Sequence, residues 1–197
     1  MKRMMTAAAV CGILFSACGG GDDIADRQAA EQRAETAAKE LVGTLLGEVQ
    51  RAMKAGGPAA AVRTCAEKAQ PLTDKVAGAH GVTLRRVTDR ARNPLDTPDT
   101  YEAAVLSRFQ EMADAGTLET GTLHSEVVAM DGRKALRYMK PITIKKPCLA
   151  CHAPAESLKP DVRDAIAEQY PDDQATGYAA GDLRGAISVI VPLEREQ

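Results

Sequence analysis

The sequence is poor in aromatic residues and in cysteine, and it contains no tryptophan. Aromatic residues make up 3% of the 197 positions, so a hydrophobic core has to be built from alanine, valine, leucine and isoleucine. No basic run, zinc-finger spacing or basic stripe with interleaved aromatics occurs, which argues against nucleic-acid binding. The formal net charge of −2 indicates no strongly charged partner. A hydrophobic content of 45% is nevertheless enough for the core of one domain.

The N-terminal apolar run is too short to cross a membrane as a helix. Two basic residues precede it, it ends at Phe15, and small residues follow. This order is typical of a secretory signal peptide. Because "FSAC" resembles a bacterial lipobox, we predict a signal peptide over residues 1–17 and a lipid on Cys18; the alternative is a plain signal ending at Ala17. Both predict export to the periplasm, and the first adds a lipid anchor in the inner or outer membrane.

The rest of the chain predicts a short lipidated tether over residues 18–24 and one domain over residues 25–197. Apolar residues recur at helical spacing on both sides of "AGGP", and Asp131-Gly132 joins two alternating runs. The expected elements are a helix over 24–55, a second helix from Pro58 that Pro71 kinks or ends, a strand over 82–88, a helix over 99–115 capped by Thr97-Pro98, a hairpin over 123–144, a short helix over 157–169 and a strand over 186–194. Long N-terminal helices with a small antiparallel sheet make an α+β fold.

The cysteines carry the clearest chemical signal. Cys11 leaves with the signal peptide and Cys18 takes the lipid, so an odd number remains in a compartment where cysteines usually pair. Two of the remainder, Cys148 and Cys151, form a C-x-x-C-H motif with His152. A zinc site, a redox dithiol and a plain disulfide are alternatives, but zinc lacks a second ligand pair, the dithiol lacks its βαβ context, and the disulfide leaves the histidine unexplained. The spacing favours one covalent haem c, with His152 on the iron.

Several residues are candidates for the opposite face of the iron. They are Cys65, His80, His124, Met112, Met130 and Met139. Cys65 differs from the others because it is an unpaired thiol on the apolar face of a helix in an exported protein. Its alternative role is that of a small buried hydrophobic residue.

Four segments together resemble a family of exported single-haem c-type proteins of unknown function. They are "RTCAEKAQPL", "RVTDRARNPLDTPDTYE", "RYMKPITIKKPCLACHAP" and "YPDDQATGYAAGDLRGAISVIVP". The resemblance implies a PAS-like fold, His152 as the proximal ligand and a distal cysteine thiolate, which falls on Cys65. It also implies that the Arg-Asn-Pro and "GYAAGDLRG" loops shape the haem pocket. Candidates to contact the haem are Arg90, Arg92, Arg137, Arg184, Tyr138 and Tyr178.

With both axial positions filled, we expect electron transfer with a redox partner protein at low potential. The alternative is a haem-based sensor of redox state or of NO or CO that acts through a separate output partner. No nucleophile–base constellation is visible, so an enzyme is not expected.

Overall fold

The long N-terminal segment is helical from Gly20 to His80 (α1) and is interrupted at one place. Gly57 has φ 72° and ψ −167°, a conformation that glycine adopts without the strain a side chain would add. The "AGGP" break predicted from sequence is therefore confirmed. The Glu48–Lys68 ion pair (3.2 Å) and the Glu40–His80 hydrogen bond (2.8 Å) join the two halves, so α1 is a helical hairpin.

Pro71 does not end the second half of α1, which was one of the two outcomes expected from sequence. The helix continues through Pro71 to His80. A proline inside a helix removes the hydrogen bond to the carbonyl four residues earlier, here that of Glu67. Both residues lie on the exposed side of the helix, where water can satisfy the carbonyl.

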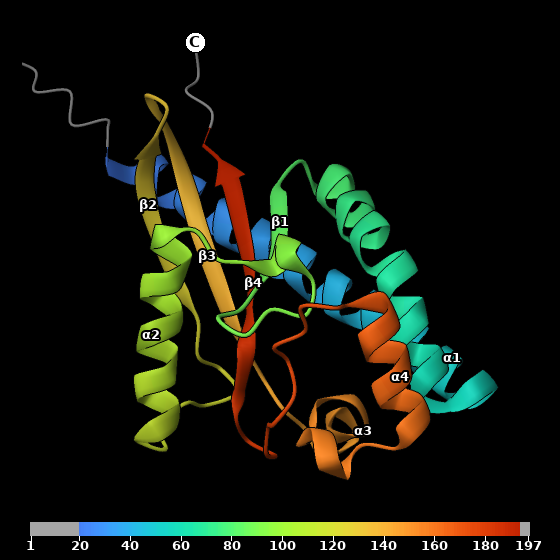
Figure 1. The fold of residues 1–197 in the computed structure, drawn as a ribbon. Helices are drawn as coiled ribbons and strands as arrows, with labels where there is room; N and C mark the ends of the chain where they lie inside the picture. The colour runs from blue at the N-terminus through green and yellow to red at the C-terminus, as the bar shows by residue number, and fades with distance from the viewer. Residues whose placement is uncertain (1–19, 194–197) are drawn as a thin grey trace, which may run out of the picture.

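Four antiparallel strands form one sheet in the order β1-β4-β3-β2 (Figure 1). The strands are β1 (Thr83–Val87), β2 (His124–Met130), β3 (Arg133–Thr143) and β4 (Leu183–Pro192). The predicted hairpin is β2 and β3, with Met130 opposite Arg133. The last strand, β4, pairs with both β1 and β3 in the middle of the sheet. The structure describes residues 20–193, so the predicted signal peptide and Cys18 lie outside the described residues.

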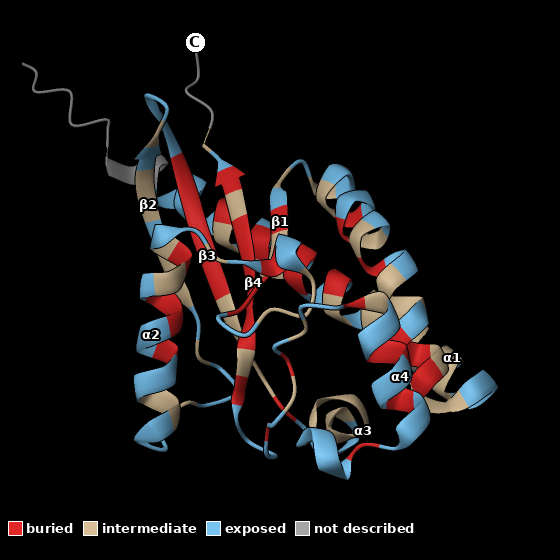
Figure 2. Ribbon diagram, in the orientation of Figure 1, coloured by how far each residue is buried: buried red, intermediate tan, exposed pale blue. Residues whose placement is uncertain are grey.

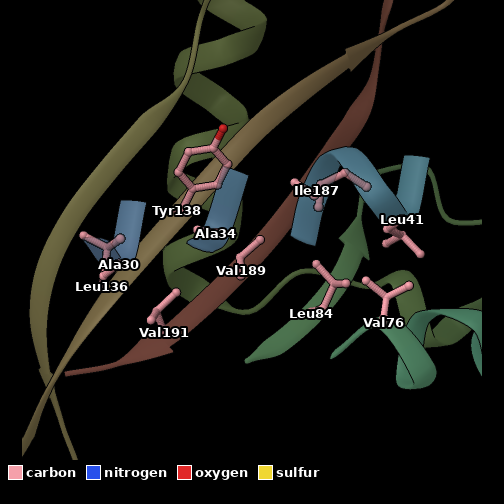
Figure 3. Close-up of a cluster of buried hydrophobic side chains, with 11 residues drawn as sticks. Ala30, Ala34, Leu41, Val76, Leu84, Leu136, Tyr138, Ile187, Val189 and Val191 are labelled. Carbon is pink, nitrogen blue, oxygen red and sulfur yellow. The ribbon is translucent and has the colours of Figure 1, made fainter. Parts of the chain in front are cut away.

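Helices cover both faces of the sheet. The first half of α1 lies behind it and α2 (Thr100–Asp114) in front of it (Figure 1). The strands β3 and β4 are buried over much of their length (Figure 2). Alternate strand residues face α1 and form the largest core cluster (Figure 3). Its members are Ala30, Ala34, Ala38, Leu41, Val76, Leu84, Leu136, Tyr138, Ile187, Val189 and Val191. Small alanines on α1 let the helix approach the sheet closely, as expected from the shortage of aromatic residues.

The cap of α2 is Asp99 and not the predicted Thr97. The Asp99 carboxylate accepts from the Glu102 N–H (2.7 Å), and the Glu102 carboxylate accepts from the Asp99 N–H (2.8 Å). This reciprocal capping box satisfies two helix N–H groups at once, which outweighs the Thr-Pro signal upstream.

The chain after β3 leaves the sheet and forms short helical turns. They are a 3₁₀ turn at Lys146–Cys148, α3 (Leu149–His152), a 3₁₀ turn at Ala155–Ser157 and α4 (Pro160–Gln169). α4 packs on the second half of α1 (Figure 1). The α+β prediction with a small antiparallel sheet and long N-terminal helices is confirmed. Within the described residues, no helix has the length and apolar character to cross a membrane.

Candidate functional site

The C-x-x-C-H motif forms a single helical turn below the end of β3. Cys148 ends the 3₁₀ turn, and Cys151 and His152 lie in α3. The two thiols stand three residues apart on a turn, so both project from the same side of it. Both are half-buried and free, like Cys65, among the described residues. The motif is therefore neither disulfide-bonded nor exposed in an open loop.

The two thiols pack against different elements. Cys148 lies with Leu149 beside a small cluster of Ile144, Ala175 and Tyr178. Cys151 packs into the cluster between α1 and α4, and its sulfur is 3.9 Å from the Pro58 carbonyl oxygen. Burial raises the pKa of the Cys151 thiol, while the positive charge of Arg92 opposes that shift.

The ring of His152 is held in one tautomer. Its Nδ1 lies 2.7 Å from the Ala175 carbonyl oxygen. A carbonyl only accepts hydrogen bonds, so Nδ1 carries the proton and Nε2 has its lone pair available. Burial, followed by the positive charges of Arg92 and Arg184, lowers the pKa of His152 to about 3. The imidazole is neutral at physiological pH, as a metal ligand has to be.

The loop of residues 173–178 supports this turn through its backbone. The Gly177 N–H donates to the Ala153 carbonyl and the Tyr178 N–H to the His152 carbonyl, each at 3.0 Å. The Tyr178 ring also meets the His152 ring edge-on, with centroids 6.1 Å apart. The importance expected of the "GYAAGDLRG" region thus has a physical basis: it fixes the position of His152.

Arg90 and Arg92, two of the residues predicted to contact the haem, connect the loop after β1 to the 173–178 loop. Arg92 donates to the Asp173 carboxylate (2.7 Å), to the Cys151 carbonyl (2.8 Å) and to the Ala175 carbonyl (3.3 Å). Arg90 donates to the Gln174 and Thr176 carbonyls and lies over the Tyr178 ring, 4.1 Å from its centroid. The bond from Arg92 to the Cys151 carbonyl holds the motif directly, and the bonds from Arg90 hold the loop that carries Ala175.

Arg184 lies close enough to His152 for its charge to act on that imidazole. Its guanidinium donates to the Thr88 hydroxyl (2.9 Å) and to the Arg90 carbonyl (3.2 Å), and it lies 5.6 Å from the Tyr178 ring centroid. Burial lowers the pKa of Arg184.

Cys65 comes to the motif from the second half of α1. The residue next to it, Ala66, packs against the same cluster as Cys151, and the charge of an ionised Cys65 would raise the pKa of Cys151. Burial raises the pKa of the Cys65 thiol, and the positive charges of Arg86 and then Arg92 oppose it. Of the residues considered for the far side of the iron, Cys65 is the one that the structure brings to Cys151.

The other candidate ligands lie elsewhere in the fold. Met112 and Met139 belong to the cluster between α2 and the sheet, and Met130 ends β2 at the hairpin turn. His80 pairs with Glu40, and the His124 ring lies 3.0 Å from the Tyr101 hydroxyl.

Two further predicted contact residues also lie away from the motif. Arg137 pairs with Asp99 at 2.7 Å beside α2, and Tyr138 lies in the core cluster on the α1 face (Figure 3). The Tyr138 hydroxyl has no hydrogen-bond partner among the described residues. Of Tyr138 and Tyr178, both of which were predicted to contact the haem, Tyr178 lies at the motif.

The donor set fits the haem c predicted from the motif. Two thiols on one turn and a neutral imidazole with Nε2 available are the groups that such a cofactor requires, and the Cys65 thiol on α1 is a further donor. Sequence reasoning missed the Ala175 carbonyl, Asp173 and Arg86. A backbone acceptor leaves no trace in sequence, and Arg86 reads only as one residue of an alternating strand.

Comparisons with known proteins agree with this fold. The model of the Tll0287-like family matches residues 25–192. The crystal structure of the cyanobacterial heme-protein Tll0287 is similar, with a TM-score of 0.59 and 21% sequence identity over 91% of this chain and 100% of that chain. No curated protein matches the chain.

Proposed function

Because the chain belongs to the Tll0287-like family, we propose that it is an exported c-type protein carrying one covalently attached haem. A similar solved protein is itself a heme-protein. The observation that carries the proposal is the geometry of one turn. Cys148 and Cys151 stand three residues apart on it, and His152 keeps Nε2 free by donating from Nδ1 to the Ala175 carbonyl. Cys148 and Cys151 would form the thioether bonds.

His152 and Cys65 are the axial ligands in this proposal. The Ala175 carbonyl orients the imidazole and increases its basicity through the Nδ1 hydrogen bond. Cys65 approaches from α1, a separate element, and binds as a thiolate. Burial raises the pKa of the Cys65 thiol, so a bound iron would have to supply most of the stabilisation of the thiolate, and the positive charges of Arg86 and then Arg92 act in the same direction as the iron. A PAS-like architecture, which the sequence resemblance implies, belongs to the same proposal.

Electron transfer is the function that this ligand set supports best. A bound haem supplies reversible one-electron chemistry, and a thiolate ligand favours its ferric form. Two protein ligands leave no position for a substrate, so the protein is proposed to act with a redox partner and not as an enzyme.

Absorption and EPR spectra of the purified protein test the ligation. Cys65→Ala is expected to abolish the low-spin ferric signal of a thiolate-ligated haem, whereas the control Met112→Leu leaves it unchanged. Unchanged spectra in Cys65→Ala would refute the distal ligand and return the role to methionine or histidine.

Sensing is the second candidate, because Cys65 and His152 lie on separate elements. If the Cys65 bond opens, α1 loses one of its links to the motif, and a partner could detect that change. Redox titrations with and without CO separate the two functions. Reversible one-electron behaviour with no CO binding supports electron transfer. Rapid CO binding to the ferrous protein with loss of the thiolate signature supports sensing.

The proposed location is the periplasm, with a lipid on Cys18 as the anchor. Metabolic labelling with a radioactive fatty acid tests it. Wild type is expected to be labelled and Cys18→Ala to be unlabelled, and equal labelling of the two would contradict the anchor.

A further inference from the structure

Arg86 lies on β1 and faces the helix that carries Cys65. It shares a strand face with Leu84, which packs with Val76 of α1 in the main core cluster. Two residues of strand advance the chain by about 6.6 Å, a little more than one helical turn of about 5.4 Å. Because β1 runs back along α1, Arg86 lies a turn closer than Leu84 to Cys65, which shares a helix face with Val76.

The hydrogen bonds of Arg86 leave one buried donor unexplained. One terminal nitrogen donates to the Asp96 carboxylate at 3.1 Å, and Asp96 is 9% exposed. The Nε atom of Arg86 is buried and has no hydrogen-bond partner among the described residues. An orphaned buried donor costs free energy unless something outside the polypeptide, or a change of ionisation state, supplies an acceptor.

We propose that Arg86 is a positioning residue for the distal ligand: anchored by Asp96, its guanidinium stabilises the Cys65 thiolate and weakens that sulfur as a donor to iron. The proposal rests on Cys65 being the distal ligand. It is consistent with the place of Arg86 on the strand face toward α1, and it gives a role to a buried guanidinium whose Nε has no hydrogen-bond partner among the described residues. It also agrees with the direction in which Arg86 acts on the pKa of Cys65.

The sign of the effect follows from charge. A positive group beside a thiolate withdraws electron density from the sulfur and disfavours the ferric state. Removing it makes the sulfur a stronger donor. A stronger donor favours ferric over ferrous iron, so the reduction potential falls.

Spectroelectrochemical titration of the holoprotein tests this inference. In Arg86→Gln, the ferric-to-ferrous ratio at the wild-type midpoint is expected to rise at least tenfold, a shift of about −59 mV for a one-electron couple. Arg63→Gln is the matched control, because Arg63 lies two residues from Cys65 but is half-exposed beside Glu168. Equal shifts in the two variants would overturn the proposal.

A double variant shows whether Arg86 acts through the sulfur. In a Cys65→Ala background, Arg86→Gln is expected to add less than a twofold change in that ratio. An undiminished shift would mean that Arg86 acts on another group, such as a haem propionate, and would overturn the proposal.

Two further measurements keep the outcomes distinguishable. The EPR signal of Cys65→Ala alone tests whether Cys65 is the distal ligand. If that variant loses the thiolate signal but Arg86→Gln still shifts the potential fully in the Cys65→Ala background, the role of Arg86 is refuted and the assignment of Cys65 as ligand is not. Arg86→Lys retains the charge without the planar fork. It is expected to shift the potential in the same direction by less, and a shift in the opposite direction would contradict the proposal.

Discussion

Arg92 offers a quantitative test of how the motif is held in place. The Arg92 and Asp173 side chains are 10% and 7% exposed, and the pair is joined at 2.7 Å. Replacing Arg92 by Met leaves the Asp173 carboxylate buried without its counter-charge and leaves the Cys151 and Ala175 carbonyls without this donor. Breaking a buried ion pair from one side costs about 3–5 kcal/mol.

Urea unfolding followed by far-UV circular dichroism measures this cost, since the chain lacks tryptophan. With an m-value of about 2 kcal/mol per molar urea, the midpoint is expected to fall by about 2 M in Arg92→Met. The exposed Arg63→Met control is expected to change stability by less than about 0.5 kcal/mol.

The double variant Arg92→Met/Asp173→Asn completes the cycle. It is expected to be at least about 1 kcal/mol more stable than the sum of the single effects. Strict additivity would refute the claim that Arg92 and Asp173 act as a pair.

Two other predictions concern the scaffold. A Cβ on Gly185 (φ 149°) would lie 2.3 Å from the Val87 carbonyl oxygen, so Gly185→Ala is expected to lower the free energy of unfolding by about 2 kcal/mol or more in urea unfolding. The control Gly43→Ala has open space around it in α1 and is expected to raise it by about 0.5–1 kcal/mol. Equal effects would contradict the packing described for β1 and β4. Burial raises the pKa of Asp99, but a backbone N–H and the Arg137 guanidinium lower it more, to below its ordinary value of 3.8. The ionised carboxylate therefore stabilises the fold above about pH 4, and this stabilisation is lost as pH falls through the folded-state pKa. Asp99→Asn keeps a helix cap, so it is expected to lose less stability than wild type between about pH 5 and pH 2, and identical acid titrations would refute this assignment.

The elements that sequence predicted well have strong local signals. Asp131-Gly132 forms the turn between β2 and β3, and the "AGGP" break separates the two halves of α1. The cap of α2 was misplaced because the Thr97-Pro98 signal competes with the Asp99-to-Glu102 capping box that the structure forms. Whether Pro71 ends its helix could not be decided from local sequence, because the cost of the proline depends on whether water can reach the carbonyl it leaves unpaired, and that depends on tertiary structure.

The site was predictable only in part. Cys148, Cys151 and His152 form a contiguous motif, so their proximity follows from covalent spacing. The approach of Cys65 depends on how α1 packs beside α4, which local patterns do not encode. Arg92 was singled out from sequence as a haem contact, which stays a prediction; what sequence did not indicate is that Arg92 donates to the Asp173 carboxylate and to the Cys151 carbonyl. Arg86 was missed because its importance follows from its strand face and its partner Asp96.

The most direct test of the account is the mass of the denatured chain, expressed in a host that matures c-type cytochromes. The account predicts a polypeptide whose mass includes one haem, retained after denaturation, and bare polypeptide in a Cys148→Ser/Cys151→Ser variant. Wild-type protein with the mass of the bare polypeptide would contradict it.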